Sequence, residues 1–143
     1  MTSLSFPDVN VWLALSSHDH VHSSAARKWW NAHAGVIAFN RFTQIGLLRL
    51  VTTSAVMNRK PLTIAQAWLV YDRFFEDDRV SLVPEPMDVE ASFRKNTTAV
   101  TVSPKIWAEA WLLAFAETAG GVLVTLDKAL ASRGAHYLLE KKG

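Results

Sequence analysis

Short apolar runs of strand type alternate with longer amphipathic segments along this chain, and this alternation limits the fold more than any other feature. The longer segments place apolar residues at helical spacing. Parallel strands need helical crossovers, so the alternation is typical of a mostly parallel sheet with helices on both faces. We therefore predict an α/β fold, with strands at 4–6, 36–39, 80–83, 122–126 and 137–139 and helices at 9–15, 25–33, 43–52, 61–75, 87–93, 105–118 and 129–132.

Residue types at the helix starts predict how several helices are capped. Ser23 or Ser24 suits the N-cap of the second helix, and Ser103 with Pro104 suits the start of the long helix that follows. No repeat, low-complexity tract or linker divides the 143 residues. We expect a single domain over residues 1–143.

Composition narrows the function classes. The chain has 15 basic and 13 acidic residues and a pI near 9.1, which permits a nucleic-acid partner without requiring one. It has no cysteine, which excludes disulfides and thiolate metal sites. The longest apolar stretch, 106–116, is too short to span a bilayer, and the first residues do not form a signal peptide. We expect a cytoplasmic protein that does not enter a membrane.

Three acidic residues stand alone among apolar neighbours. Asp8 and Asp127 each follow a predicted strand, at the edge of an open parallel sheet where ligands bind. Glu109 carries the only charge in the apolar segment 106–116, where an unpaired carboxylate is costly. Carboxylates that gather at one edge repel each other, and Mg²⁺ or Mn²⁺ would relieve that repulsion.

Structural roles compete with this interpretation for each acid. Asp8 and Asp127 suit helix N-caps, and Glu109 could pair with Arg41 or Arg49. No single acid decides between the roles, but capping alone would not explain three acids at one edge.

Four segments form an ordered set that spans nearly the whole chain: 6–15 with its Asp-x-Asn, 41–52, 107–116 and the Val-Thr-Leu-Asp at 124–127. Together they resemble a known family, the PIN-domain ribonucleases and in particular the VapC-like toxins. Two positions depart from the family pattern. Gln44 stands where many members have Glu, and Glu109 stands where Asp is usual.

The resemblance implies a PIN-like three-layer α/β/α sandwich and a site that binds Mg²⁺ or Mn²⁺. Its metal ligands would be Asp8, Glu109 and Asp127, and these acids together with Gln44 would form the catalytic set. Asn10 and Thr125 would support them. A metal-activated water would hydrolyse RNA, and Gln44 would orient that water or the phosphate. A cognate antitoxin and a homodimer are also implied.

Arg41 and Arg49 are candidates for phosphate contact, and structural ion pairs are the competing interpretation. A catalytically weak PIN domain that binds RNA or protein is the main alternative function, because Gln44 removes a charge. A receiver-like domain or an aspartyl phosphatase fits less well, because paired acids after the first strand are missing and Asn10 replaces the second Asp.

Two further groups favour structural roles. The histidines at 18, 20 and 22 alternate in a polar segment without cysteine, so we expect a solvated loop there and no metal site. Trp68, Trp107 and Trp111 lie in predicted helices, where we expect them to be core residues.

Overall fold

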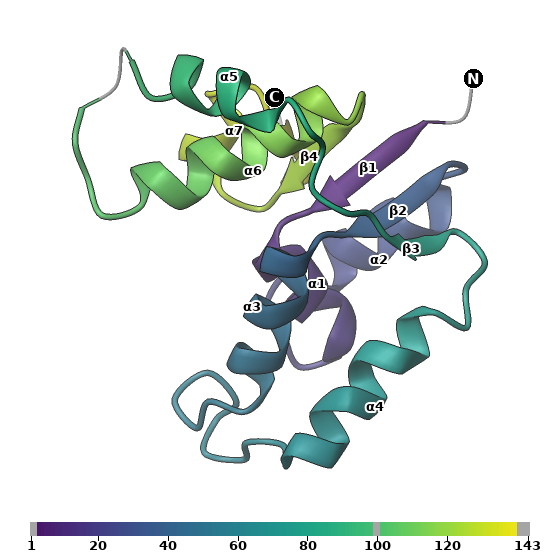
Figure 1. The fold of residues 1–143 in the computed structure, drawn as a ribbon. Coiled ribbons are helices and arrows are strands. Elements are labelled where there is room, and N and C mark those ends of the chain that lie inside the picture. The colour runs from purple at the N-terminus through teal and green to yellow at the C-terminus, as the bar shows by residue number, and fades with distance from the viewer. Residues whose placement is uncertain (1–2, 99–100, 140–143) are drawn as a thin grey trace.

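A parallel sheet forms the centre of the molecule in the computed structural model, which describes residues 3–98 and 101–139. Within these residues the sheet has five strands in the order β3-β2-β1-β4-β5 (Figure 1). Every neighbouring pair is parallel, so the carboxyl ends of the strands share one edge. This confirms the α/β prediction, with the strands at β1 (Leu4–Pro7), β2 (Val36–Phe39), β3 (Val80–Leu82), β4 (Val122–Thr125) and β5 (His136–Tyr137).

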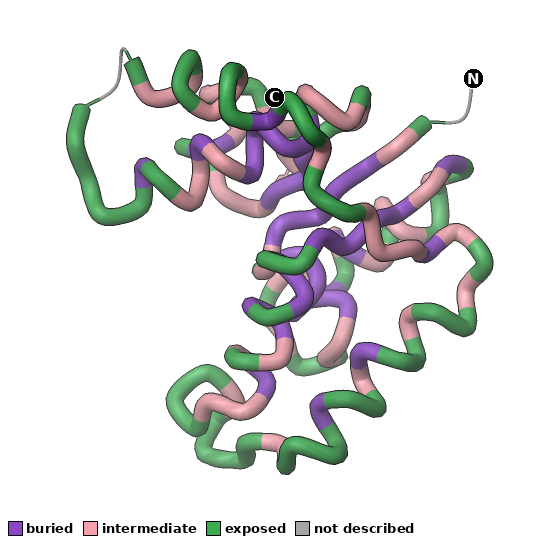
Figure 2. The backbone as a smooth tube through the Cα atoms, viewed as in Figure 1, coloured by how far each residue is buried: buried purple, intermediate pink, exposed green. Residues whose placement is uncertain are grey.

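Helices pack on both faces of this sheet and divide the core into two clusters. Adjacent residues of β2 show the division, because Ile37 and Phe39 belong to one cluster and Ala38 to the other. Figure 2 shows buried backbone concentrated in the central strands, while α4 is exposed along most of its length. The first cluster is covered by α1 (Val9–Ser16), α2 (Ser23–Ala32), α3 (Arg41–Val51) and α4 (Ile64–Phe74), and the second by α5 (Val89–Lys95), α6 (Ile106–Thr118) and α7 (Lys128–Ala131).

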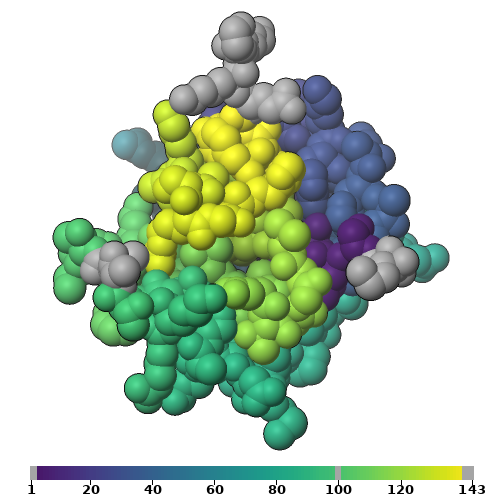
Figure 3. Space-filling model, turned by 90° about the horizontal axis from the view of Figure 1, so that it is seen from above, coloured from purple at the N-terminus to yellow at the C-terminus, as the bar shows by residue number. Residues whose placement is uncertain are grey.

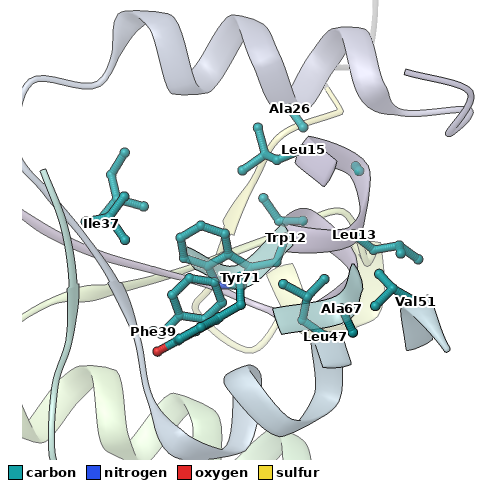
Figure 4. Packing of buried hydrophobic residues seen from close by; sticks show 13 residues of the cluster. Trp12, Leu13, Leu15, Ala26, Ile37, Phe39, Leu47, Val51, Ala67 and Tyr71 are labelled. Carbon is teal, nitrogen blue, oxygen red and sulfur yellow. The ribbon is translucent and has the colours of Figure 1, made fainter. Parts of the chain in front are cut away.

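Aromatic packing dominates the first cluster. Trp12 is fully buried and stacks on Phe39 with ring centroids 3.6 Å apart, and Phe74 meets the same indole edge-on. Figure 4 shows the Trp12 and Phe39 rings side by side with Tyr71. Burying such side chains contributes about 2 kcal/mol each, so this group fixes α1 and α4 against β2.

The second cluster lies between the sheet and the C-terminal helices. Phe6 of β1 meets Phe115 of α6 edge-on, with ring centroids 5.3 Å apart. Seen from above, the later segments cover most of the surface and leave only a small part of the N-terminal strand in view (Figure 3). The strand order places β1 in the middle of the five described strands, between β2 and β4.

The helix starts correct three predictions. Ser23 and Ser24 lie inside α2, whose N-cap is His22. The Ser23 hydroxyl accepts a hydrogen bond from Arg27 one turn later in the helix and so does not cap it. Ser103 does not cap α6, which begins after Lys105 without a side-chain cap bond. The helix predicted from 61 begins instead at Ile64, where Thr63 forms a capping box.

Two of the three tryptophans predicted as core are exposed. Trp68 is 45% exposed and Trp107 is 60% exposed. In α4, Ala67 and Tyr71 take the inward positions, which leaves Trp68 toward solvent. Trp111 is half-buried between the rings of Phe42 and Phe115.

No helix within 3–98 and 101–139 is both long enough and apolar enough to cross a membrane.

Candidate functional site

Asp8 is positioned by the end of β1 and the start of α1. Its backbone N–H donates to the carbonyl of Val124 in β4 at 2.9 Å, which continues the pairing of the two strands. Its Oδ1 accepts a hydrogen bond of 3.2 Å from the N–H of Val11, so Asp8 is the N-cap of α1. Only 6% of the residue is exposed, which is little for an acid.

Thr125 joins Asp8 to Asp127. Its buried hydroxyl donates to Oδ2 of Asp8 at 2.6 Å and accepts from the backbone N–H of Asp127 at 2.9 Å. Asp127 is also an N-cap, because its Oδ1 accepts from the N–H groups of Ala129 and Leu130 at the start of α7. Capping leaves Oδ2 of Asp127 without a hydrogen-bond partner among the described residues.

The surroundings of Asp8 disfavour its negative charge, mainly because the residue is buried. Burial raises the pKa of Asp8, and the nearby charge of Asp127 raises it further. Hydrogen bonds from Thr125, Val11 and the backbone of Asn10 act in the opposite direction and do not outweigh burial. A cation at this edge would stabilise the charged form of Asp8.

Gln44 reaches the same edge from α3. Asn40 follows β2 and forms a capping box with Thr43, so α3 begins at Arg41, two residues before the predicted start. Arg41 and Gln44 consequently lie one turn apart, and Nη1 of Arg41 donates to Oε1 of Gln44 at 2.6 Å. The Gln44 amide also bonds to Tyr71, whose pKa is nevertheless raised by burial.

Glu109 lies in the first turn of α6 with a different partner from the one predicted. Its Oε1 is 3.9 Å from Nη1 of Arg133, so it pairs with neither Arg41 nor Arg49. Arg133 is itself held by a hydrogen bond from Nη2 to the carbonyl of Asn96. No hydrogen bond or ion pair within the described ranges links Glu109 to Asp8 or Asp127.

The structure therefore assembles part of the predicted site. Asp8, Thr125 and Asp127 form one hydrogen-bonded unit, and Gln44 with Arg41 forms another. Across 3–98 and 101–139, no three acidic, histidine or cysteine residues come close enough together to hold a metal ion. The histidines at 18, 20 and 22 therefore form no such group.

The remaining predicted residues lie farther out. Asn10 is exposed in the first turn of α1 and contributes through its backbone. Arg49 is exposed and lies eight residues after Arg41 on α3, or about 12 Å along the helix axis. Of the two arginines, only Arg41 lies next to a predicted catalytic side chain.

Three residues of the site were not identified from the sequence. Asn40 follows a predicted strand and has Thr three residues later, a pattern that signals a cap. Tyr71 and Arg133 have no such local signal, because their partners are distant in sequence.

Comparison with known proteins shows which family has this parallel α/β fold with acidic residues at the strand ends. The family model described as PIN domain matches residues 5–135, so the chain belongs to the PIN-domain family.

Within that family the chain is similar to the VapC ribonuclease toxins. It is 43% identical to "Ribonuclease VapC41" of Mycobacterium tuberculosis over 133 residues, which cover 89% of this chain and 91% of that protein. It is 32% identical to "Ribonuclease VapC39" of the same organism over 141 residues, covering 93% and 95%. These relationships confirm the resemblance to the VapC branch.

The fold has a close counterpart among solved structures. Mycobacterium tuberculosis VapC20, described as a sarcin–ricin loop cleaving toxin, superposes with a TM-score of 0.64 at 13% identity, covering 92% of this chain and 95% of that one. At this identity the likeness concerns the fold alone, and it confirms the PIN-like architecture.

Proposed function

We propose that this chain is a divalent-metal-dependent endoribonuclease and the toxin of a toxin–antitoxin pair, with its active site at the carboxyl edge of the sheet. The observation that carries the proposal is the buried unit in which Thr125 links Asp8 to Asp127. Its relatives VapC41 and VapC39 are named ribonucleases, which supports RNA as the substrate.

The donors at this edge suit Mg²⁺ or Mn²⁺. Both ions prefer carboxylate oxygens, and Oδ2 of Asp127 has no hydrogen-bond partner within the described part of the chain. Asp8 is destabilised as an anion by burial and by Asp127, so a cation would bind where it relieves an existing cost. Glu109 would be the third ligand, and to reach the metal its side chain would have to leave its 3.9 Å contact with Arg133.

When bound, the metal supplies an acidified water and stabilises negative charge on the phosphate. The side chains of this protein have separate tasks. Thr125 holds the Asp8 carboxylate in one orientation through its 2.6 Å hydrogen bond. Gln44, fixed by Arg41, orients the attacking water or the phosphate, and Arg41 contacts the phosphate with its remaining N–H groups. Asn10 supports the site from the first turn of α1. Arg49 would contact a phosphate farther along the strand.

Apolar side chains on α3 and α4 support the proposed protein partners. Ile45, Ile64 and Leu69 are each more than half exposed, and Phe42 and Trp68 are more than 40% exposed. Apolar residues exposed in such number are typical of protein interaction surfaces. We propose that an antitoxin and a second copy of this chain cover part of them.

RNA cleavage by the purified protein tests the function. Total RNA is incubated with Mg²⁺ or Mn²⁺, with EDTA as a control, and fragment ends are sequenced. We expect cuts that leave 5′-phosphates and 3′-hydroxyls. The Asp8→Asn variant should lose at least about a hundredfold in rate, because it removes a proposed metal ligand. The matched control is Asp78→Asn, which alters an exposed acid after α4.

Folding of each variant is checked by circular dichroism. Asp8→Asn protein that is folded and fully active would refute the site. No cleavage by folded, metal-loaded wild-type protein would favour the alternative of a catalytically weak binding module. Gln44 and Glu109 would then be the first residues to replace with those that are usual in the family.

A further inference from the structure

A small depression lies beside the candidate active site, at the carboxyl ends of β2 and β3. It has a volume of about 210 Å³ and lies between the start of α3, the segment after β3 and the middle of α6. Figure 1 shows that segment crossing from β3 toward α5, between α3 and α6. Pockets for drug-sized ligands begin at about 300 Å³, so this depression suits a group the size of a single ring system.

Arg41 connects the depression to the catalytic residues. Its side chain lines the depression, and its Nη1 donates to Gln44 at 2.6 Å. A strand of RNA whose phosphate contacts Arg41 would therefore have one neighbouring base within reach of the depression.

Aromatic and apolar side chains form the walls. Trp111 is half-buried and is held by Phe115 at 5.2 Å on the same helix and by Phe42 of α3 at 5.7 Å, measured between ring centroids. Leu82 and Pro84 complete the apolar lining. An indole fixed in this way provides a stacking surface whose conformational entropy is already restricted.

A carboxylate supplies the polar contact. Glu85 lines the depression and is exposed, and within the described ranges its side chain forms neither an ion pair nor a hydrogen bond. An ionised carboxylate only accepts hydrogen bonds. Among the four RNA bases, guanine presents two adjacent donors, N1–H and N2–H, which match the two oxygens of one carboxylate.

We propose that this depression is a nucleobase subsite that takes a guanine of the RNA substrate. Trp111 stacks on the base, Glu85 accepts from its N1–H and N2–H groups, and Arg41 binds the adjoining phosphate. This inference rests on the proposed ribonuclease function and adds a sequence preference to it.

Binding of short RNAs tests the subsite without relying on cleavage. Asp8→Asn protein in EDTA is titrated with the fluorescent hexanucleotides UUUGUU, UUUAUU, UUUCUU and UUUUUU, and affinity is measured by fluorescence anisotropy. We expect the guanine-containing RNA to bind about tenfold more tightly than the others. Equal affinities, or no binding by any of the four RNAs, would overturn the proposal.

Two variants in the same background separate the roles. Glu85→Gln should bring the guanine-containing RNA within twofold of the others, because it replaces an acceptor oxygen with a donor. Trp111→Leu should weaken all four RNAs by about tenfold, because stacking is available to every base. The matched control, Glu76→Gln, changes another exposed carboxylate and should keep the guanine preference. Retained preference in Glu85→Gln would overturn the assignment.

A basic side chain of a protein partner is the competing occupant, because an arginine could stack on Trp111 and pair with Glu85. Acetyl-arginine-amide and guanosine monophosphate are each added to the protein while the Trp111 indole N–H signal is followed by NMR. A shift of this signal with acetyl-arginine-amide, and none with guanosine monophosphate, would overturn the nucleobase assignment. The binding assay and the cleavage assay test the two proposals separately. A guanine preference without cleavage would retain the subsite and refute the nuclease, whereas metal-dependent cleavage without base preference would refute the subsite alone.

Discussion

Replacing Thr125 with valine should destabilise the protein more than its size change suggests. Valine keeps the shape of threonine but removes a buried hydroxyl that donates to Asp8 and accepts from Asp127. A hydrogen bond to a charged group contributes about 2 kcal/mol and a neutral one about 1 kcal/mol. The expected loss is about 3 kcal/mol, which lowers the melting temperature of a domain of this size by about 10 °C.

The same substitution should have a pH signature. The Thr125 hydrogen bond lowers the pKa of Asp8 and so favours its charged form. The loss of stability in Thr125→Val should therefore be greatest at neutral pH, where the bond to the charged form counts most. It should shrink as the pH falls through the folded-state pKa of Asp8, because a protonated Asp8 gains less from the hydroxyl.

Thermal melts of Thr125→Val and Thr125→Ser between pH 4 and pH 8 test this reasoning. Serine keeps the hydroxyl and loses one buried methyl, which costs about 1 kcal/mol at every pH. Equal losses in the two variants, or a pH-independent difference between them, would refute the role assigned to the hydroxyl.

Three further substitutions test other parts of the structure. In metal-free protein, Asp8→Asn should gain stability relative to wild type as the pH rises above the ordinary aspartate pKa of 3.8. Burial raises the pKa of Asp8 in the folded state, so charging it there costs stability. Melting temperatures in EDTA that change with pH in the same way for both proteins would contradict this. Gly46→Ala should lose about 2 kcal/mol in urea titrations, because its Cβ would lie 2.6 Å from a methyl carbon of Val9, and a neutral effect would show that α1 and α3 can separate freely. Arg79→Lys should lose about 1 kcal/mol and speed hydrogen exchange at the end of α2, because Arg79 donates to the carbonyl of Trp30 at 2.7 Å; unchanged exchange would refute that anchoring.

The strands and helices could be predicted from the sequence because periodicity reports burial directly. The run 122–126 and the helix after Lys105 were found within a residue or two. Helix starts were harder, because several side chains compete for the same role. Asn40 caps α3 where none was predicted, and the Ser23 hydroxyl bonds Arg27 inside α2.

The candidate site was predictable only where it depends on strand ends. Asp8 and Asp127 each follow a strand, and parallel pairing then brings them to one edge. Their connection also requires the register that places Pro7 opposite Val124, which local patterns do not contain. Capping, weighed as an alternative, proved to be a real role of both acids and coexists with their place at the edge.

Glu109 shows where sequence reasoning ended. Its apolar surroundings predicted a compensating partner, but nothing nearby in the chain indicated Arg133 rather than Arg41 or Arg49. The exposure of Trp68 and Trp107 has the same origin, because composition does not reveal which side of a helix another element covers.

The central claim is that Asp8 and Asp127 form a divalent-metal site, and locating Mn²⁺ by anomalous scattering in crystals tests it most directly. We predict a peak at about 2.2 Å from a carboxylate oxygen of Asp8 or Asp127, and its loss in Asp8→Asn crystals. Mn²⁺ bound only elsewhere, or no bound Mn²⁺ at a saturating concentration, would contradict it.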